Sequence, residues 1–435
     1  MSRIQANYVG IISSVKPLYF LCKIAGLVPF SFSVDLETGT EIINTNIYSN
    51  IFSVAWSLLV FFVLVGGTIH YCFAMISSTN ITAFYITAFM VSFPLTLLMS
   101  KLAILMNLTL NRQKFSDLWK KLNDIDIALL QYGGPRKNIW FKVEMAFLLL
   151  IILPWMCADA WLWAGRITFF GEAILRLSHL VQMLVVIQFC KLTQLLRRSL
   201  KDLNKALTVN IDNELRTSFI AAKEYPNSRY RKVNSIGITP VIRHISTQCI
   251  LANVEDISEE SIISNSFTEA CSFLKIRRIY GQIYEAVDYV NSIYGLPMLL
   301  EFVRNILAVI VNIFQITTIF RNRTEQSIIY GLPSYVFTFL GACWVIVFIS
   351  REAAVTFSCH MATSEARKIQ DNVQIILLRQ NIREETMEQL KLFSAQLTAN
   401  MIRFTAFGFF TLSLSTLSTF IASVITYIVV LEQMK

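Results

Sequence analysis

Seven long apolar stretches divide this chain, and each is long enough to cross a lipid bilayer. A helix needs about 20 residues to span the roughly 30 Å of hydrocarbon in a membrane. The stretches lie at residues 50–76, 81–107, 143–165, 172–196, 289–320, 328–350 and 404–431. Because 54% of the residues are hydrophobic and only 15% are charged, the composition exceeds what a soluble core requires. The sequence therefore predicts an all-α polytopic membrane protein with seven transmembrane helices.

Lysine and arginine gather in alternate connections between these stretches, and this bias sets the orientation. Positive residues accumulate on the cytoplasmic side of a membrane protein during insertion. Of the 38 Lys and Arg residues, 3 precede the first stretch, and 7, 13 and 7 fall in segments 108–142, 197–288 and 351–403. The sequence therefore predicts a cytoplasmic N-terminus and an extracellular C-terminus. Two Asn-x-Thr glycosylation sequons, at Asn80 and Asn322, then lie outside the cell.

This orientation divides the chain into four parts. Residues 1–49 form a cytoplasmic N-terminal segment, and residues 50–350 hold transmembrane helices 1–6 with cytoplasmic loops 108–142 and 197–288. Residues 351–403 form cytoplasmic anchor helices, and residues 404–435 hold a seventh helix and the extracellular C-terminus.

Several cytoplasmic segments carry apolar residues at helical spacing. Within 351–403 these are Ile369, Val373, Ile376, Leu377, Ile382, Leu390, Phe393 and Leu397. Residues 108–131 predict an extension of the second membrane helix, and residues 267–288 predict a lead into the fifth. The stretch 208–266 is rich in Ser, Asn and charge, which predicts a mobile loop. We expect the cytoplasmic helices to pack as a bundle, within one subunit and between subunits.

Enzyme chemistry finds no support in the sequence. The four histidines have no Asp, Glu or Cys at metal-ligand spacing; they are His70, His179, His244 and His360. There is no Gly-rich phosphate loop and no Gly-x-Ser-x-Gly elbow. The net charge of +9 comes mostly from the cytoplasmic loops, where anionic lipid favours it and no nucleic-acid partner is needed. We therefore expect no enzyme activity, no cofactor and no metal site, with membrane lipid as a partner.

The last apolar stretch is dotted with hydroxyl side chains. They are Ser413, Ser415, Thr416, Ser418, Thr419, Ser423 and Thr426. A lipid-facing helix gains nothing from them, whereas a helix that lines a water-filled passage offers them to water or ions. The pattern indicates a pore-lining helix.

Two motifs near the C-terminus resemble those of the insect gustatory receptor family. Thr426-Tyr427, followed after five residues by Gln433, resembles the signature that closes these receptors. Cys359-His360-Met361-Ala362 and Glu365-Ala366-Arg367-Lys368 are similar to a segment of the fructose-sensing branch. The resemblance implies a tastant-gated, non-selective cation channel in the plasma membrane of chemosensory neurons. It also implies a homotetramer, or a heterotetramer with related receptors, in which the seventh helices line one pore.

The resemblance assigns the gate to the end of the seventh helix. Gln433 would form a polar ring that closes the pore. The sequence departs from the signature at Met434, where Phe is usual, and at Glu432, where the family has an apolar residue. Glu432 is either part of a carboxylate ring at the pore mouth or an exposed terminal carboxylate near Lys435.

Aromatic and polar residues in the outer half of the membrane helices predict the ligand site. Asp159 and Trp163 lie on one helical face, at a spacing that resembles the fructose-sensing relatives. The offset of Trp344 from Cys359 also resembles theirs. Further predicted ligand residues are His179, Gln182, Asn312, Gln315 and Tyr335. Tryptophans near a membrane surface also serve as ordinary anchors, which is the alternative reading for Trp155, Trp161 and Trp163.

Several functional alternatives remain open at this stage. Both a sugar and a plant-derived bitter compound suit tryptophan rings beside a carboxylate. A metabotropic seven-helix receptor conflicts with the predicted orientation, and a transporter conflicts with the lack of repeat symmetry.

Glu301 and Arg304, three residues apart in the fifth stretch, are expected to pair structurally.

Overall fold

The computed structural model describes residues 11–34, 41–44, 50–77, 83–130, 153–164, 169–224, 260–321, 328–329, 332–378, 382 and 384–433. Its helices are α2 (Ile11–Ile24), α3 (Ile51–Ser77), α4 (Ala83–Thr109), α5 (Arg112–Leu129), α7 (Leu153–Ala164), α8 (Phe169–Glu224), α10 (Glu260–Arg321), α11 (Ser334–Leu377), α12 (Glu384–Ala399) and α13 (Leu414–Gln433). Short antiparallel strand pairs join β1 (Ser31–Val34) to β2 (Glu41–Asn44), β3 (Ile328–Ile329) to β4 (Leu332–Pro333), and β5 (Thr405–Ala406) to β6 (Phe410–Thr411). The predicted mostly helical membrane fold is confirmed.

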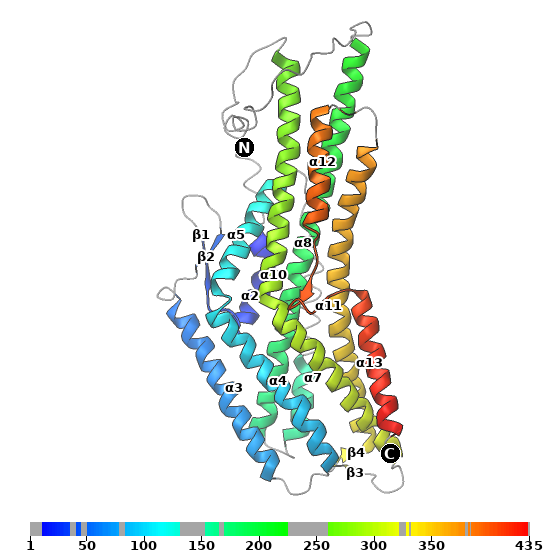
Figure 1. The fold of residues 1–435 in the computed structure, drawn as a ribbon. Coiled ribbons are helices and arrows are strands. Elements are labelled where there is room, and N and C mark those ends of the chain that lie inside the picture. The colour runs from blue at the N-terminus through cyan, green and yellow to red at the C-terminus, as the bar shows by residue number, and fades with distance from the viewer. Residues whose placement is uncertain are drawn as a thin grey trace.

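Three helices are far longer than a bilayer requires. α8, α10 and α11 have 56, 62 and 44 residues. At about 1.5 Å per residue, α10 is roughly 93 Å long, about three times the hydrocarbon thickness. These three helices run side by side along the molecule, with α3, α4, α7 and α13 in its lower half and α12 in its upper half (Figure 1). We call the lower half the membrane tier and the upper half the anchor tier.

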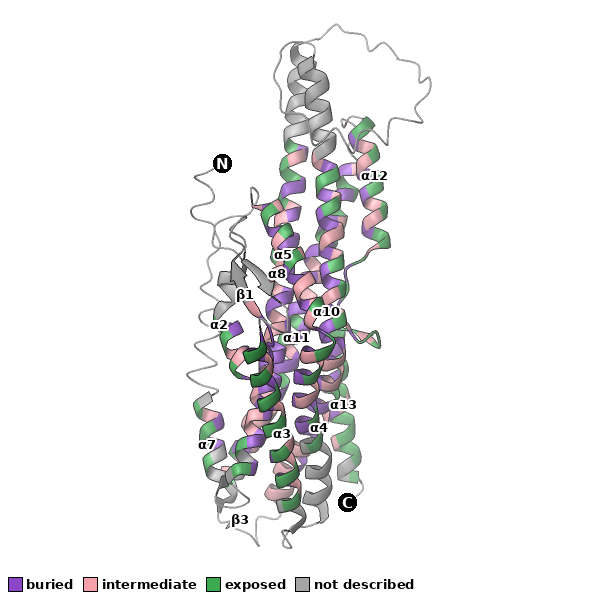
Figure 2. Ribbon diagram, turned by 90° about the vertical axis from the view of Figure 1, so that its left-hand side faces the viewer, coloured by how far each residue is buried: buried purple, intermediate pink, exposed green. Residues whose placement is uncertain are grey.

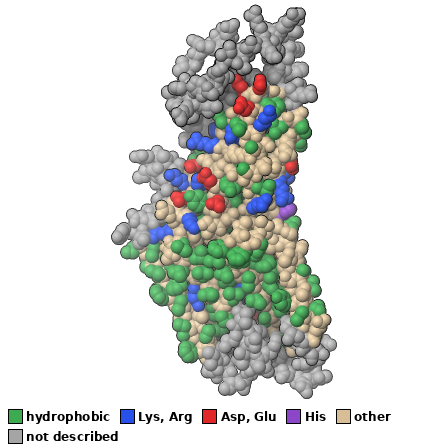
Figure 3. Space-filling view, viewed as in Figure 1, with side chains coloured by type: hydrophobic (Ala, Val, Ile, Leu, Met, Phe, Trp, Pro, Cys, Tyr) green, Lys and Arg blue, Asp and Glu red, His purple; other side chains and the backbone are tan. Residues whose placement is uncertain are grey.

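The surface chemistry follows the same division. Hydrophobic side chains gather over the membrane tier, and most of the visible Lys, Arg, Asp and Glu lie above them (Figure 3). Within the described residues, four helices contain segments long and apolar enough to cross a membrane, namely Ile51–Phe73, Ala173–Asp212, Ser272–Ile319 and Thr338–Leu377. A shorter apolar helix covers Leu414–Val430. The chain therefore has the character of a membrane protein.

Apolar residues at helical spacing form the core of the anchor tier. On α8 they include Leu196, Leu200, Leu203 and Leu207, all fully buried. The predicted apolar positions of α11, of α12 and of the connection between them join the same core; these are Ile369, Val373, Ile376, Leu377, Ile382, Leu390, Phe393 and Leu397. The long helices bury one side and expose the other along this tier (Figure 2). Helical periodicity thus identified these packing faces.

A bend separates the second membrane helix from the segment that follows it. α4 ends at Thr109 and α5 begins at Arg112, and the two axes meet at 73°. Asn107 donates to the carbonyl of Leu27 at 2.9 Å, and Asn111 donates to the Asn107 side chain at 3.2 Å. Residues 108–131 therefore do not continue α4 along the same axis. The hydrogen bonds of Asn107 and Asn111 connect the bend to the N-terminal segment.

The seventh helix begins later than its apolar stretch. Residues 404–413 contain the β5–β6 turn, in which Phe407 and Gly408 have φ angles of 53° and 79°. Backbone in this left-handed region cannot continue a right-handed helix. α13 begins at Leu414, directly after Ser413 accepts a hydrogen bond from the Thr416 N–H at 3.0 Å.

Two further boundaries differ from the sequence prediction. α11 begins at Ser334, because residues 328–333 include the β3–β4 pair. α8 continues as helix to Glu224, into the stretch predicted as a loop from residue 208. At the other end of the predicted loop, residues 260–266 are also helical, because α10 begins at Glu260. Residues 225–259 lie outside the described residues.

Candidate functional site

Asp159 on α7 is the centre of a buried polar contact between three helices. Its side chain is 1% exposed. Its Oδ2 lies 2.8 Å from Arg176 Nη2 on α8 and accepts a hydrogen bond from Trp344 Nε1 on α11 at 3.2 Å. A buried carboxylate is costly unless it is paired and hydrogen-bonded, and Asp159 has both kinds of partner. The carboxylate therefore joins α7, α8 and α11.

Aromatic rings surround the same point. Ring centroids lie 4.7 Å apart for Trp155 and Trp344, 4.9 Å for His179 and Trp344, and 5.4 Å for Trp344 and Phe348. The Arg176 guanidinium carbon lies 5.5 Å from the centre of the Trp344 ring, within range of a cation–π contact. We call Trp155, Asp159, Arg176, His179 and Trp344 the Asp159 cluster. It combines flat apolar surface with a carboxylate and a cation.

Two predicted ligand residues belong to α8: His179, which is a member of this cluster, and Gln182, which is one turn further along the helix. His179 and Gln182 are both buried, and Gln182 Nε2 donates to the backbone carbonyl of Thr96 at 2.5 Å. Within the described part of the protein, His179 Nδ1 and Gln182 Oε1 have no hydrogen-bond partner. A small cavity of about 20 Å³ lies beside Gln182, between α4, α8 and α10. One water or one ligand hydroxyl would satisfy such polar atoms.

The remaining predicted ligand residues lie on α7, α10 and α11. Asn312 donates to its own helix at the Ala308 carbonyl, 2.7 Å away. Gln315 is half-buried, and Tyr335 is 73% exposed. Trp163 belongs to the last turn of α7, and its side chain lies outside the described residues. The structure thus brings together Asp159, His179 and Trp344.

Sequence reasoning missed Arg176 and Phe348. Arg176 lies one turn from His179 on the same face of α8. Phe348 lies one turn from Trp344 on α11 and belongs to a buried group with Phe420 and Val424 of α13. Through Phe348, the Asp159 cluster shares its packing with the seventh helix.

A buried ionic group lies between α10 and α11, further toward the anchor tier. Glu301 Oε1 accepts a hydrogen bond from Arg304 Nη2 at 3.1 Å, as the sequence predicted, and forms an ion pair with Arg351, whose Nη2 lies 2.5 Å away. Asn305 Nδ2 donates to Glu352 at 3.1 Å, and Asn305 also accepts from Arg304. We call these five residues the α10–α11 ionic group. It carries two carboxylates and two guanidinium groups, so its formal charges cancel.

Two features of this ionic group were not expected from the sequence. The sequence assigned Arg351 and Glu352 to the cytoplasmic anchor helices. Both are buried, and Arg351 pairs with Glu301, which belongs to the fifth apolar stretch. The Arg304 guanidinium carbon also lies 4.8 Å from the centre of the Phe348 ring. A continuous series of contacts therefore runs from Asp159 through Trp344 and Phe348 to the ionic group.

α13 packs on α10 and α11 with one face only. Phe420 and Val424 are buried, whereas the signature residues Thr426, Tyr427 and Gln433 are exposed. Glu432 belongs to the last turn of α13, and its side chain lies outside the described residues, as does Met434. The sequons at Asn80 and Asn322 also lie outside them. Among the described residues, no group of three His, Cys, Asp or Glu side chains could hold a metal ion.

Comparison with known proteins identifies the family. A family model for the 7tm chemosensory receptor matches residues 15–435. The structure of the olfactory receptor OR5 from the insect Machilis hrabei is similar, with a TM-score of 0.61, 14% identity, and coverage of 98% of this chain and 99% of OR5. OR5 in complex with eugenol gives a TM-score of 0.62 at 13% identity, with the same coverage. Comparison with curated proteins finds no match.

The two kinds of comparison support different statements. At such low identity, the OR5 structures show a common fold and no more. The family model spans almost the whole chain, and it describes a receptor family rather than an enzyme family. This chain belongs to the 7tm chemosensory receptor family.

Proposed function

We propose that this chain forms a ligand-gated, non-selective cation channel that a small tastant opens. The observation that carries the proposal is a polar stripe on α13. Its polar members are Ser415, Thr419, Thr426 and Gln433, which are spaced so that they share one helical face and are all exposed; Ala422 and Val429 lie between them on the same face. Phe420 and Val424, on the opposite face, are buried against the rest of the chain. The protein thus directs a polar helix face away from its own body.

The hydroxyls of this polar stripe suit an ion pathway. Thr419 and Thr426 each donate to the carbonyl one turn earlier, at 3.0 and 2.9 Å. Their donors are satisfied within the helix, while their oxygen lone pairs stay available to water or cations. In the tetramer that the gustatory-receptor resemblance suggests, four stripes face one axis, and Gln433 forms a ring at the extracellular end. The four chains are copies of this one or related receptors.

The Asp159 cluster is the proposed ligand site. A sugar would stack its apolar face on Trp344 and offer hydroxyls to Asp159, and an aromatic bitter compound would use the same rings. The OR5 complex with eugenol supports a small organic ligand for this fold. Ligand contact with Trp344 would move Phe348, which packs in the same buried group as α13. This shared packing is the proposed link between ligand and gate.

Excised-patch recording with sugars and plant metabolites tests the channel function. Ligand-evoked current without cytosolic components supports it, and current that requires intact cells and G proteins contradicts it. Cysteine substitutions then locate the pore. Thr419→Cys and Thr426→Cys lie on the polar stripe, so a charged thiol reagent should block their current. Ile421→Cys is the matched control, because Ile421 is also exposed, at 43%, but on another face.

A further inference from the structure

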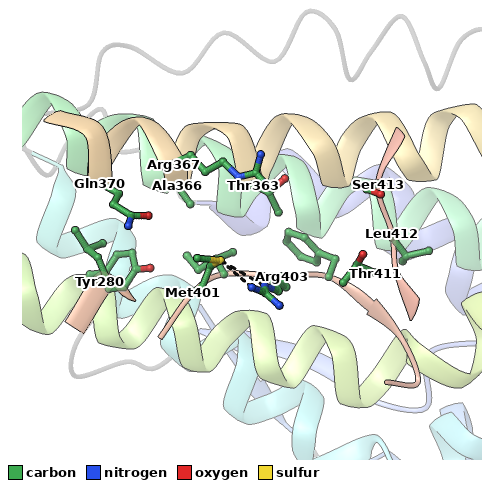
Figure 4. Close-up of a pocket in the computed structure, with 13 residues that line it drawn as sticks. Tyr280, Thr363, Ala366, Arg367, Gln370, Met401, Arg403, Thr411, Leu412 and Ser413 are labelled. Atoms are coloured by element: carbon green, nitrogen blue, oxygen red, sulfur yellow. Dashed lines mark hydrogen bonds between the residues drawn. The ribbon is translucent and has the colours of Figure 1, made fainter. Parts of the chain in front are cut away.

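A polar cavity lies where the anchor tier meets the start of α13. Its volume is about 210 Å³, and its walls come from α10, α11, α12 and residues 401–413. Arg367 and Gln370 enter it from α11, and Arg403 approaches it from the segment that leads into β5 (Figure 4). Since one water occupies about 30 Å³, the cavity holds a few waters or one small polar group. It is smaller than the sites that enclose a drug-sized ligand.

Two guanidinium groups border this cavity without a carboxylate partner. Within the described residues, neither Arg367 nor Arg403 makes an ion pair. Arg403 donates only to the Met401 sulfur, at 3.1 and 3.4 Å, and a thioether is a weak acceptor. Glu365, on the same helix as Arg367, is engaged by Lys368 at 3.1 Å. Both side chains are exposed, so the cavity presents two solvated positive charges with no carboxylate paired to them among the described residues.

Hydrogen bonds to α10 hold the wall that carries Arg403. Tyr280 donates to the Asn400 carbonyl at 2.9 Å. Asn291 donates to the Arg403 carbonyl at 2.9 Å and accepts from the Thr405 N–H at 3.0 Å. A binding group on a backbone fixed in this way loses less entropy when it engages a ligand. The arginine backbone is therefore positioned before any ligand arrives.

We infer that this cavity binds a phosphate group. Arg367 and Arg403 supply charge and paired N–H donors, which match phosphate oxygens, and the Gln370 amide adds a neutral donor. The cavity is lined by Leu412 and Ser413, directly before the apolar helix α13, and lipid headgroups gather at the ends of membrane-spanning apolar segments. A phosphorylated lipid headgroup and a soluble inositol phosphate share this chemistry. Because Leu412 and Ser413 line the cavity and lead into α13, the occupant would contact the start of the proposed pore helix.

Native mass spectrometry of the purified full-length protein tests the inference. The probes are inorganic phosphate, inositol hexakisphosphate and a short-chain phosphatidylinositol bisphosphate. We expect saturable retention of at least one probe per chain, weakened about tenfold or more in the double variant Arg367→Gln/Arg403→Gln. The matched control Arg278→Gln/Lys391→Gln removes the same charge from positions on α10 and α12 that are equally exposed but do not line the cavity, and should change affinity by about twofold or less.

The probes also distinguish the source of the phosphate. Retention of the lipid alone identifies a membrane headgroup, and equal retention of inositol hexakisphosphate identifies a soluble phosphate; both results support the site. Equal weakening in the control, or no saturable binding of any probe, overturns it. A changed oligomeric mass in the double variant with undiminished probe binding also overturns it, because the cavity would then be a subunit interface. None of these readouts depends on channel activity.

Discussion

Single residues in the membrane tier are defined by their partners more than by their own chemistry. Asp159 is a buried acid, and its ion pair with Arg176 and its bond from Trp344 make that burial tolerable. Its charge and its place on a membrane helix could be read from the sequence. Its partners could not, because spacing along one helix fixes a face but not the neighbouring helix that meets it. Arg176 was missed for this reason, and Tyr335 proved exposed.

Asp159→Asn should separate charge from shape at this position. The amide preserves the volume but leaves the guanidinium of Arg176 without its counter-charge, which typically costs about 3 kcal/mol when the pair is buried. We expect a lower melting temperature of the purified protein and a ligand response at least about tenfold weaker. Asp288→Asn, at an exposed position on α10, is the control and should leave both unchanged. A wild-type response in Asp159→Asn would remove this carboxylate from the proposed ligand site.

Gln433→Ala should test the gate. The exposed amide lies in the last turn of α13, in the position that the receptor signature assigns to the pore constriction. Loss of its hydrogen bonds should destabilise the closed state, so single-channel recording should show more openings without ligand. Unchanged resting openings and unchanged ligand gating would show that Gln433 does not close the pore.

At the scale of elements, periodicity located the helices but not their interruptions. The apolar positions of α11 and α12 were legible because a buried face repeats every three to four residues over several turns. The β5–β6 turn could not be predicted, because strands of two residues are too short to show a repeating apolar pattern. Its signal was local, in Gly408 with positive φ and in the Ser413 and Thr416 pair that starts α13. The bend after α4 had no proline or glycine to mark it.

Two glycines of α10 offer a test of how the β5–β6 turn is held. A Cβ on Gly295 would lie 2.9 Å from the backbone nitrogen of Phe407, whereas a Cβ on Gly281 would meet only the Gln396 amide at 3.5 Å. Gly295→Ala should displace the turn and lower the melting temperature. Gly281→Ala should be neutral or stabilising by up to about 1 kcal/mol, because alanine favours helix. Equal melting temperatures for the two variants would show that the turn moves without cost.

At the scale of the whole molecule, the sequence predicted membrane helices with a helical anchor bundle beside them, but not which helices run unbroken through both tiers. Apolar length distinguishes segments that cross the bilayer, yet α8, α10 and α11 pass from the membrane tier into the anchor tier without a break. The change appears only as a shift from an apolar surface to an amphipathic one (Figure 3). Which long helices lie side by side depends on contacts between distant parts of the chain, such as Asp159 with Trp344.

The predicted orientation is testable on the intact protein. An epitope tag after Lys435 should bind antibody on unpermeabilised cells, while a tag before Met1 should require permeabilisation. The physical reason is the excess of Lys and Arg in the segments assigned to the cytoplasm. The reverse labelling pattern would place the anchor tier outside the cell and would contradict the proposed pore polarity.

The α10–α11 ionic group also constrains biosynthesis. A charged residue at the centre of a membrane helix raises the free energy of insertion by about 2.5 to 3.5 kcal/mol. Glu301 and Arg304 pair within α10. Arg351 and Glu352 of α11 meet their partners, the carboxylate of Glu301 and the amide of Asn305, only when α11 lies against α10. α10 and α11 should therefore leave the translocon as a preassembled pair, so that neither helix meets lipid with an unmatched charge.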